Sequence, residues 1–173
     1  MDLQKLKSIK VLILDVDGVL TDGRVIYTDS GEEIKRFDVR DGHGLKLLMR
    51  SGIEVILLTG RESKVVLHRA RDLGIEHVYQ KALKKIEVYK TILADRSLED
   101  KDVGFVGDDL IDLPVLRKVG FSAAVPDAVQ EVKEIVDYIT TKRGGEGAVR
   151  EICELLLKAQ NKWEALTAKY YTT

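Results

Sequence analysis

The sequence has little cysteine and no surplus of either charge, which argues against a disulfide-stabilised fold and against a nucleic-acid-binding protein. The single cysteine, Cys153, excludes an internal disulfide and fits a reducing compartment. Lysine and arginine total 28 against 29 aspartate and glutamate, so the net charge of -1 offers no basic surplus for nucleic acid. No apolar run is long enough to cross a membrane, and the first ten residues lack the apolar stretch of a secretion signal. We therefore expect a cytoplasmic protein with no nucleic-acid or membrane partner.

Short apolar runs alternate with helical patterns along the 173 residues, a length that suits one domain. A run of this kind is typical of a strand that is buried on both faces. The runs cover residues 11–14, 53–58, 75–79, 103–106, 121–125 and 136–139. Strands that alternate with helices form a parallel sheet with helices on both faces. We predict a three-layer, Rossmann-like, doubly wound α/β fold that forms a single domain over residues 1–173.

Two segments depart from this alternation. Residues 24–37 place short apolar stretches around Asp29-Ser30-Gly31, which predicts a β-hairpin after the first strand. Its arms carry few apolar residues and an isolated hairpin is marginal in water, so we expect it to pack on another element or subunit. Residues 148–169 have apolar positions at helical spacing and predict one long amphipathic helix. No segment remains that is long enough to form a separate cap domain.

The first strand runs directly into Asp15-Val16-Asp17-Gly18. The C-terminal ends of strands form the edge at which open parallel sheets bind ligands. Two carboxylates this close repel each other, and a hard cation such as Mg²⁺ relieves that repulsion. If this pair of aspartates stood alone, the plainer interpretation would be that both form a turn or cap a helix. The residues at the other strand ends therefore decide between a structural role and a metal site.

Two further strands end in polar residues, Thr59-Gly60-Arg61 and Gly107-Asp108-Asp109. In a doubly wound sheet these ends converge with Asp15 on one crevice. Asp108 can then add a third carboxylate to a metal site, and Asp112 can orient a neighbouring cation. A site of this charge that receives a phosphate also calls for a lysine, and three lysines follow the strand at residues 75–79. These candidates are Lys81, Lys84 and Lys85.

Four stretches, in this order, resemble the motifs of the haloacid dehalogenase-like phosphohydrolases. They are DVDGVLTDG (residues 15–23), LLTGR (57–61), a lysine near Lys85 and GDDLIDLP (107–114). The first stretch alone is a weak signal, but all four in order at sensible spacing are a strong one. The resemblance implies a metal-dependent phosphatase that works through a covalent intermediate.

The resemblance also implies a role for each residue. Asp15 would be the nucleophile that forms an aspartyl-phosphate, and Asp17 the general acid and base. Asp15, the backbone carbonyl of Asp17 and Asp108 would hold Mg²⁺, or a similar ion such as Mn²⁺ or Co²⁺. Thr59 would bind a phosphoryl oxygen and Lys85 would balance its charge. The supporting residues would be Gly60, Asp109 and Asp112.

The lysine assignment depends on counting. In the narrower phosphatase family that the chain resembles, described next, a glycine usually follows the Tyr-Gln pair, four residues before the lysine. Here Lys81 follows Tyr79-Gln80. Counting from Tyr79 gives Lys85 as the functional lysine, with Lys84 as the main competitor and Lys81 as surface charge.

A narrower resemblance spans nearly the whole chain. The stretches GEEIKRFDVRDGHGLKLL, GDDLIDLPVLRKVG and GGEGAVREICELLLKAQ look like the family of 3-deoxy-D-manno-octulosonate (KDO) 8-phosphate phosphatases. This family releases KDO on the way to lipopolysaccharide, lacks a cap domain and forms homotetramers. In it, the hairpin of one subunit helps to close the neighbouring site, and the C-terminal tail can reach into an adjoining one. The resemblance implies the same partners and assembly here.

The same resemblance implies a set of substrate contacts. A sugar acid phosphate carries a carboxylate as well as a phosphate, which suits the forked guanidinium of arginine. The implied contacts are Asp17, Asp38, Val39, Arg40, Asp41, Gly42, Lys46, Arg61, Arg69 and Lys85. Lys46 and Arg69 fit a solvated helix face equally well, whereas Arg61 directly follows Thr59-Gly60.

Two other interpretations stay open at this point. The first keeps the chemistry but changes the substrate to the phosphate of a nine-carbon, sialic-type acid, which inspection of residues 38–46 does not separate. The second is a non-catalytic oligomerisation module, since similar domains occur as appendages of sugar nucleotidyltransferases. Such a module should have lost a catalytic carboxylate, whereas Asp15, Asp17 and Asp108 are all present.

Overall fold

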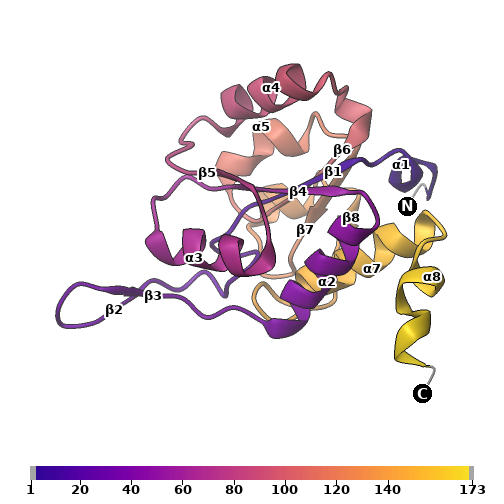
Figure 1. The fold of residues 1–173 in the computed structure, drawn as a ribbon. Helices are drawn as coiled ribbons and strands as arrows, with labels where there is room; N and C mark the ends of the chain where they lie inside the picture. The colour runs from indigo at the N-terminus through magenta and orange to yellow at the C-terminus, as the bar shows by residue number, and fades with distance from the viewer. Residues whose placement is uncertain (1–2, 172–173) are drawn as a thin grey trace.

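A computed structural model describes residues 3–171 and places six parallel strands in one sheet (Figure 1). The strand order across the sheet is β5-β4-β1-β6-β7-β8, which puts β1 near the middle. These strands are β1 (Val11–Leu14), β4 (Glu54–Leu58), β5 (His77–Tyr79), β6 (Val103–Gly107), β7 (Phe121–Ala124) and β8 (Tyr138–Ile139). The prediction of a parallel, doubly wound α/β fold is confirmed.

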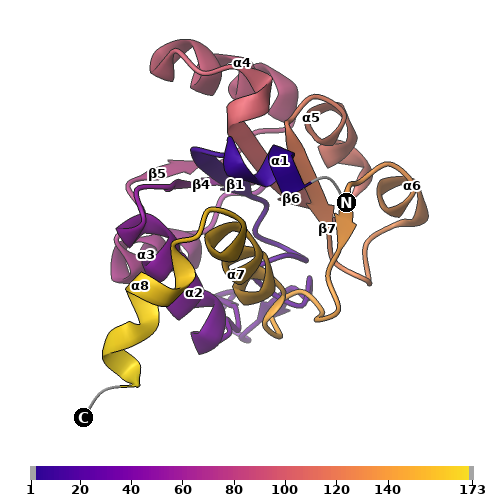
Figure 2. The same cartoon turned by 90° about the vertical axis from the view of Figure 1, so that its right-hand side faces the viewer.

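Helices cover both faces of the sheet and complete three layers (Figures 1 and 2). One face carries α1, α2, α3 and α7, and the other carries α4, α5 and α6. The helices are α1 (Leu3–Lys7), α2 (Val39–Arg50), α3 (Lys64–Leu73), α4 (Lys85–Arg96), α5 (Leu113–Leu116), α6 (Gln130–Lys133), α7 (Ala148–Ala159) and α8 (Trp163–Thr167), with 3-10 turns η1 (Asp100–Asp102), η2 (Leu110–Asp112) and η3 (Ala168–Tyr170). Among the described residues, no helix has the length and apolar content needed to span a membrane.

Strand β1 belongs to both halves of the core. Leu12 and Leu14 pack in the layer of α2, α3 and α7, whereas Val11 and Ile13 pack in the layer of α4, α5 and α6. All four side chains are buried. Burial of one such side chain contributes about 1.5–3 kcal/mol, so β1 fixes the position of the aspartates that follow it.

The predicted hairpin is present at residues 24–37. Its strands β2 (Ile26–Tyr27) and β3 (Glu33–Ile34) pair antiparallel, and Gly31 between them has a positive φ of 82°. The hairpin projects away from the three layers (Figure 1). Its apolar side chains remain exposed in the single chain, Ile26 at 44% and Tyr27 at 60%.

The prediction of one continuous helix over residues 148–169 is wrong. Helix α7 ends at Ala159, and α8 begins only at Trp163. Asn161 adopts the left-handed conformation (φ 55°), and the Lys162 amide donates to the Leu157 carbonyl at 2.8 Å. This is the hydrogen-bond pattern of a Schellman C-terminus, in which asparagine replaces the usual glycine. The chain therefore turns there and α8 leaves the axis of α7 (Figure 2).

Candidate active site

The carboxyl ends of two adjacent strands bring three carboxylates together. Strands β1 and β6 pair along their length, so Asp15 directly after β1 lies beside Asp108 directly after β6. Oxygens of Asp15, Asp108 and Asp112 all lie within 4.8 Å of one another. The chain leaves β1 toward β4 on one side and returns to β6 on the other, so the cluster occupies the point where the strand order reverses.

Two glycines make this approach possible. Gly18 has a φ of 95°, and a Cβ atom at this position would overlap the carboxylate of Asp108. A Cβ atom at Gly107 would lie 2.6 Å from the Asp112 Cγ. Any larger residue at either position would push one of the carboxylates out of the cluster.

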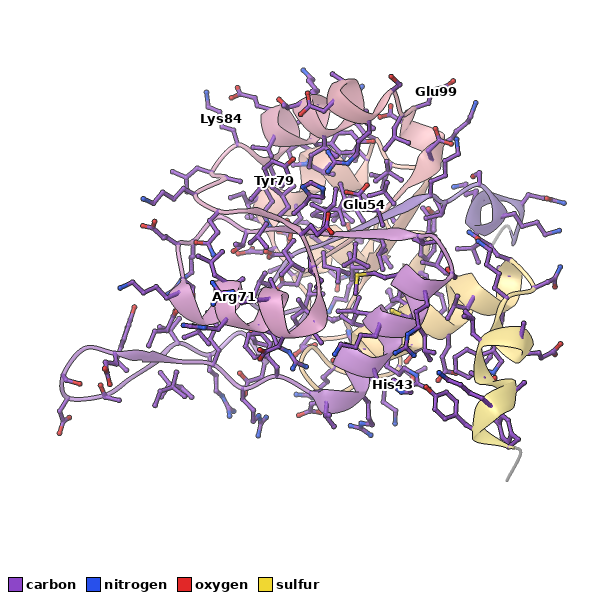
Figure 3. All side chains as sticks on the ribbon, in the orientation of Figure 1. His43, Glu54, Arg71, Tyr79, Lys84 and Glu99 are labelled. Atoms are coloured by element: carbon purple, nitrogen blue, oxygen red, sulfur yellow. The ribbon has the colours of Figure 1, made fainter. Side chains whose placement is uncertain are left out.

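The structure distinguishes the three candidate lysines. The Lys85 Nζ lies 2.9 Å from Asp15 Oδ1 and 2.6 Å from Asp112 Oδ1, and its side chain is only 1% exposed. Lys84 points into solvent, away from the sheet (Figure 3), with 77% of its side chain exposed. Lys81 is also on the surface, in a left-handed conformation (φ 57°) that favours glycine. Of the three, only Lys85 contacts the carboxylates.

The cluster holds more negative charge than Lys85 balances. Burial raises the pKa of Asp108 to about 8, and the charges of Asp15 and Asp112 add to the rise. Burial also raises the pKa of Asp15 to about 6, although Lys85 acts in the opposite direction. Burial alone would lower the pKa of Lys85, but the attraction of Asp15 and Asp112 more than offsets it and the pKa is raised.

One oxygen of this cluster lacks a hydrogen-bond partner among the residues that the structure describes. Asp108 Oδ1 is buried and accepts no hydrogen bond from the described residues. A buried carboxylate oxygen without a donor is costly, and a cation would satisfy it. Carboxylate oxygens are the ligands that hard cations such as Mg²⁺ prefer. The residues around Asp15 therefore fit a divalent metal site.

Asp112 and Asp109 shape the loop that carries Asp108. Asp112 Oδ2 accepts hydrogen bonds from the amides of Asp108 at 3.0 Å and Asp109 at 3.3 Å, while Asp112 Oδ1 binds Lys85. The side chain of Asp109 caps η2 by accepting from the Leu110 amide at 2.7 Å. Both side chains therefore fix the backbone of the loop around Asp108.

The loop after β4 reaches the same edge of the sheet. Thr59 is buried, and its amide donates to the Tyr79 carbonyl at 2.9 Å. Its Oγ1 accepts from the Arg61 amide at 3.4 Å, which curls residues 59–61 into a turn. A Cβ at Gly60 would meet Ile111 at 3.5 Å, an ordinary contact, so this glycine is not required for space.

Asp17 is held by the hairpin, which sequence reasoning did not anticipate. Its carboxylate pairs with Lys35, whose side chain is fully buried, and lies 3.7 Å from the Arg61 Nε. Glu33 completes the group, with its Oε1 3.3 Å from the Lys35 Nζ and 2.8 Å from the Arg61 Nη2. Glu33 Oε2 also accepts from the Ser63 hydroxyl. We call Asp17, Lys35, Glu33 and Arg61 the ion-pair ring.

A signal for the ion-pair ring was present in the sequence. Glu33 and Lys35 are two residues apart, so in an extended arm they share one face while Ile34 takes the other. The alternation predicts that one of these two faces meets the protein, and the 48% exposure of Ile34 in the structure shows that it is the charged face.

The predicted substrate contacts at the start of α2 divide into two groups. Asp38 caps α2 and pairs with Arg40 at 2.7 Å, and Val39 is 78% exposed. These three residues line an open cavity of about 740 Å³. Its remaining wall is formed by Arg36, Phe37, Lys142, Gly145 and Glu146. The cavity adjoins the loop after β1, because the Gly145 amide donates to the Val19 carbonyl at 3.1 Å.

Asp41 and Gly42 do not reach that cavity surface and are buried instead. Asp41 Oδ1 accepts from the Arg150 amide at 2.7 Å, in the first turn of α7, and burial raises its pKa to about 6. Both residues pack between helices in the single chain, and their role as substrate contacts stays a prediction. Arg69 donates to the Asp38 carbonyl at 3.2 Å, and Lys46 is half-buried on α2.

Comparison with known proteins shows close relatives. Residues 75–152 match the family model described as haloacid dehalogenase-like hydrolase. The chain is 48% identical over 158 residues to the 3-deoxy-D-manno-octulosonate 8-phosphate phosphatase KdsC of Escherichia coli K12, which covers 91% of this chain and 84% of that protein.

Two solved structures are similar over almost their whole length. The structure of 3-deoxy-D-manno-octulosonate 8-phosphate phosphatase from Moraxella catarrhalis, in complex with a magnesium ion, a phosphate ion and KDO, has a TM-score of 0.95 at 45% identity and covers 97% of each chain. The cobalt-bound deoxy-D-mannose-octulosonate 8-phosphate phosphatase from Haemophilus influenzae has a TM-score of 0.90 at 41% identity and covers 97% of this chain and 99% of that one.

Proposed function

Since the chain belongs to the 3-deoxy-D-manno-octulosonate 8-phosphate phosphatases of the haloacid dehalogenase-like hydrolases, we propose that it hydrolyses KDO 8-phosphate to KDO and phosphate. The reaction would supply KDO for lipopolysaccharide. The observation that carries the proposal is the buried cluster of Asp15, Asp108 and Asp112 around Lys85. A non-catalytic module would have no need for this costly grouping of charge.

The metal of this reaction would be Mg²⁺, with Co²⁺ as a substitute, as in the two solved relatives. Asp15, the Asp17 backbone carbonyl and Asp108 would hold it. When bound, the cation offsets the repulsion between the phosphate and the carboxylate that attacks it. Asp108 Oδ1, which accepts no hydrogen bond within residues 3–171, is the oxygen that this ion would satisfy.

The proposed chemistry proceeds in two steps on this chain's residues. Asp15 Oδ1 accepts from the Val16 amide at 2.7 Å and contacts Lys85, which leaves Oδ2 to attack phosphorus. The new bond joins Asp15 to phosphorus while the bond to the sugar oxygen breaks, and Asp17 donates a proton to that oxygen. Water then attacks the aspartyl-phosphate, Asp17 takes its proton, and phosphate leaves. Thr59 and Lys85 would hold the phosphoryl oxygens throughout.

The sugar-acid end of the substrate would lie in the open cavity beside the loop after β1. Arg40 and Lys142 line this cavity and can pair with a carboxylate. Arg61 and Arg69 stay candidate contacts on the side of the hairpin. Lys46 stays a candidate as well.

We also propose that the protein acts as a homotetramer in the cytoplasm. Exposed apolar side chains on the hairpin, among them Val25, Ile26 and Ile34, would be covered by a neighbouring subunit. Light scattering should give four times the monomer mass, and an Ile26→Glu variant should dissociate. A fully active monomer would refute this assembly.

Turnover of sugar phosphates, with Mg²⁺ and with chelator, tests the proposed function. KDO 8-phosphate should be hydrolysed faster than the phosphate of a nine-carbon sialic-type acid, and chelator should stop both reactions. A clear preference for the nine-carbon substrate would replace the proposed substrate. No turnover of any sugar phosphate in the presence of Mg²⁺ would leave the oligomerisation module as the better interpretation.

A further inference from the structure

The geometry points to Lys35 as a positioning residue for Asp17, delivered by the hairpin to the active site of its own subunit. This inference rests on the proposed function, because it assigns Asp17 to proton transfer. It gives the hairpin a second role besides any contact with a neighbouring chain.

The first support is the burial of Lys35. An ammonium group whose side chain is fully buried must be compensated, and both of its partners are carboxylates, Asp17 and Glu33. The backbone around Lys35 lies in an otherwise exposed arm, so the side chain turns inward from the surface. Such a side chain stabilises the arm only where its charge meets a partner in the body of the protein.

The second support is the closure of the ion-pair ring. Each cation contacts both carboxylates, and each carboxylate contacts both cations, so Asp17 is constrained from two directions. Lys35 takes Asp17 Oδ1, whereas Arg61 approaches Oδ2 at 3.7 Å. The longer contact leaves Oδ2 as the oxygen that is free to exchange a proton with a substrate oxygen or water.

Glu33 anchors this arrangement to the body of the chain. Its Oε2 accepts from the hydroxyl of Ser63, the N-cap of α3. Gln80 holds Ser63 in turn, through hydrogen bonds of 3.0 and 2.9 Å to its amide and carbonyl. Lys35 is thus held from behind by groups on α3 and after β5, and its position does not depend on another subunit.

The test separates proton transfer from general damage. Proton donation to the leaving oxygen matters for the alkyl ester KDO 8-phosphate but little for p-nitrophenyl phosphate, whose leaving group needs no proton. The value of kcat/KM reports the step in which that group leaves. Lys35→Met should lower kcat/KM for KDO 8-phosphate by about 10²-fold and for p-nitrophenyl phosphate by less than about tenfold, given a usual acid–base contribution of 10²–10⁴-fold.

Matched variants exclude the simpler explanations. Lys35→Arg keeps the charge and should recover most of the loss, and Glu33→Gln should show a weaker form of the same selectivity. Glu32→Gln and Lys90→Met alter exposed side chains and should behave as the wild type. Circular dichroism and light scattering show whether each variant keeps its fold and assembly.

Equal losses for both esters in a folded Lys35→Met protein, or no loss at all, would overturn the inference. Failure of the proposed function is a different result, because it would appear in the wild type as no turnover of KDO 8-phosphate. The ester comparison would then use another alkyl phosphate that the wild type hydrolyses.

Discussion

Two charged groups lie side by side at the loop after β1, and they are built in opposite ways. The cluster of Asp15, Asp108 and Asp112 has three carboxylates for one lysine, and its Asp108 Oδ1 accepts no hydrogen bond from the part of the chain that the structure describes. The ion-pair ring has two carboxylates and two cations, each in contact with its opposites. The negative charge of the first group is balanced only when a cation binds from solution, whereas the charges of the second group are balanced by residues of the chain itself.

The pKa values follow this difference. Burial raises the pKa of Asp108 to about 8, because too few positive charges oppose it. Burial also acts against ionisation of Glu33, but the Ser63 hydrogen bond and the charges of Lys35 and Arg61 lower its pKa. The comparison teaches that the carboxylate cluster is destabilising in the metal-free protein, whereas the charges of the ion-pair ring compensate one another.

Asp15→Asn gives the largest expected effect and tests the first group directly. The amide cannot form the aspartyl-phosphate, so hydrolysis should fall by more than about 10⁴-fold while the fold survives. Removal of one of three crowded carboxylates should also raise the free energy of unfolding of the metal-free protein. Steady-state kinetics and urea unfolding measure the two quantities, with exposed Asp95→Asn as the control. Unchanged turnover would rule out the covalent mechanism.

Asp108→Asn should separate the two groups by their response to Mg²⁺. The ion should stabilise the wild type by about 2.7 kcal/mol at a concentration 100 times its Kd, and this gain should vanish in Asp108→Asn. Turnover should fall by about 10²–10³-fold, the usual cost of a lost electrostatic partner. Glu33→Gln lies in the ion-pair ring and should bind Mg²⁺ as the wild type does. Calorimetric titration and thermal unfolding give both readouts, and equal Mg²⁺ affinity in all three proteins would contradict the comparison.

The pH dependence of stability should differ in sign between the groups. The unfolded chain releases the Asp108 proton near its ordinary pKa of 3.8, whereas the folded, metal-free chain retains it until about pH 8. The folded state binds more protons in this window, so the free energy of unfolding should fall as pH rises, by at most about 1.4 kcal/mol per unit for this group. Asp15, with a pKa of about 6, steepens the fall between pH 4 and 6.

The contribution of Glu33 lies outside that window. Its lowered pKa gives stability that is present above the ordinary value of 4.5 and lost as pH falls further. Urea unfolding in chelator at pH 5, 6, 7 and 8 measures the fall due to the carboxylate cluster, and Mg²⁺ at pH 8 should reverse it. If the free energy of unfolding instead rose from pH 5 to 8 without metal, the negative charge of the cluster would have to be balanced by a group other than Lys85, and the prediction would be wrong.

Strand ends were predictable from the sequence because one physical rule governs them. Apolar runs such as Val11–Leu14 form parallel strands, and polar residues after them must meet at one edge, which placed Asp15, Thr59 and Asp108 correctly. The hairpin was also predictable, from its glycine-containing turn and short arms.

Side-chain direction in irregular segments was less predictable. The sequence predicted that the hairpin packs on another element or subunit, but not that Glu33 and Lys35 make its contacts with the body of the chain. The resemblance named Asp41 as a substrate contact but did not indicate that its side chain is buried against α7. The end of α7 depended on Asn161, whose left-handed conformation competes with an otherwise continuous amphipathic pattern.

Lys84→Met is expected to have the smallest effect, and it isolates the compensating charge of the carboxylate cluster. Lys84 and Lys85 are adjacent, but the Lys84 side chain is 77% exposed, whereas the Lys85 ammonium lies between Asp15 and Asp112. Lys84→Met should change stability by less than about 0.5 kcal/mol and leave kcat and KM unaltered. Lys85→Met should abolish turnover and lower stability by about 3–5 kcal/mol, because it leaves buried carboxylates unpaired. Kinetics and urea unfolding of the two variants, side by side, measure this difference. If Lys84→Met were inactive and Lys85→Met active, Lys84 rather than Lys85 would be the lysine that the cluster requires.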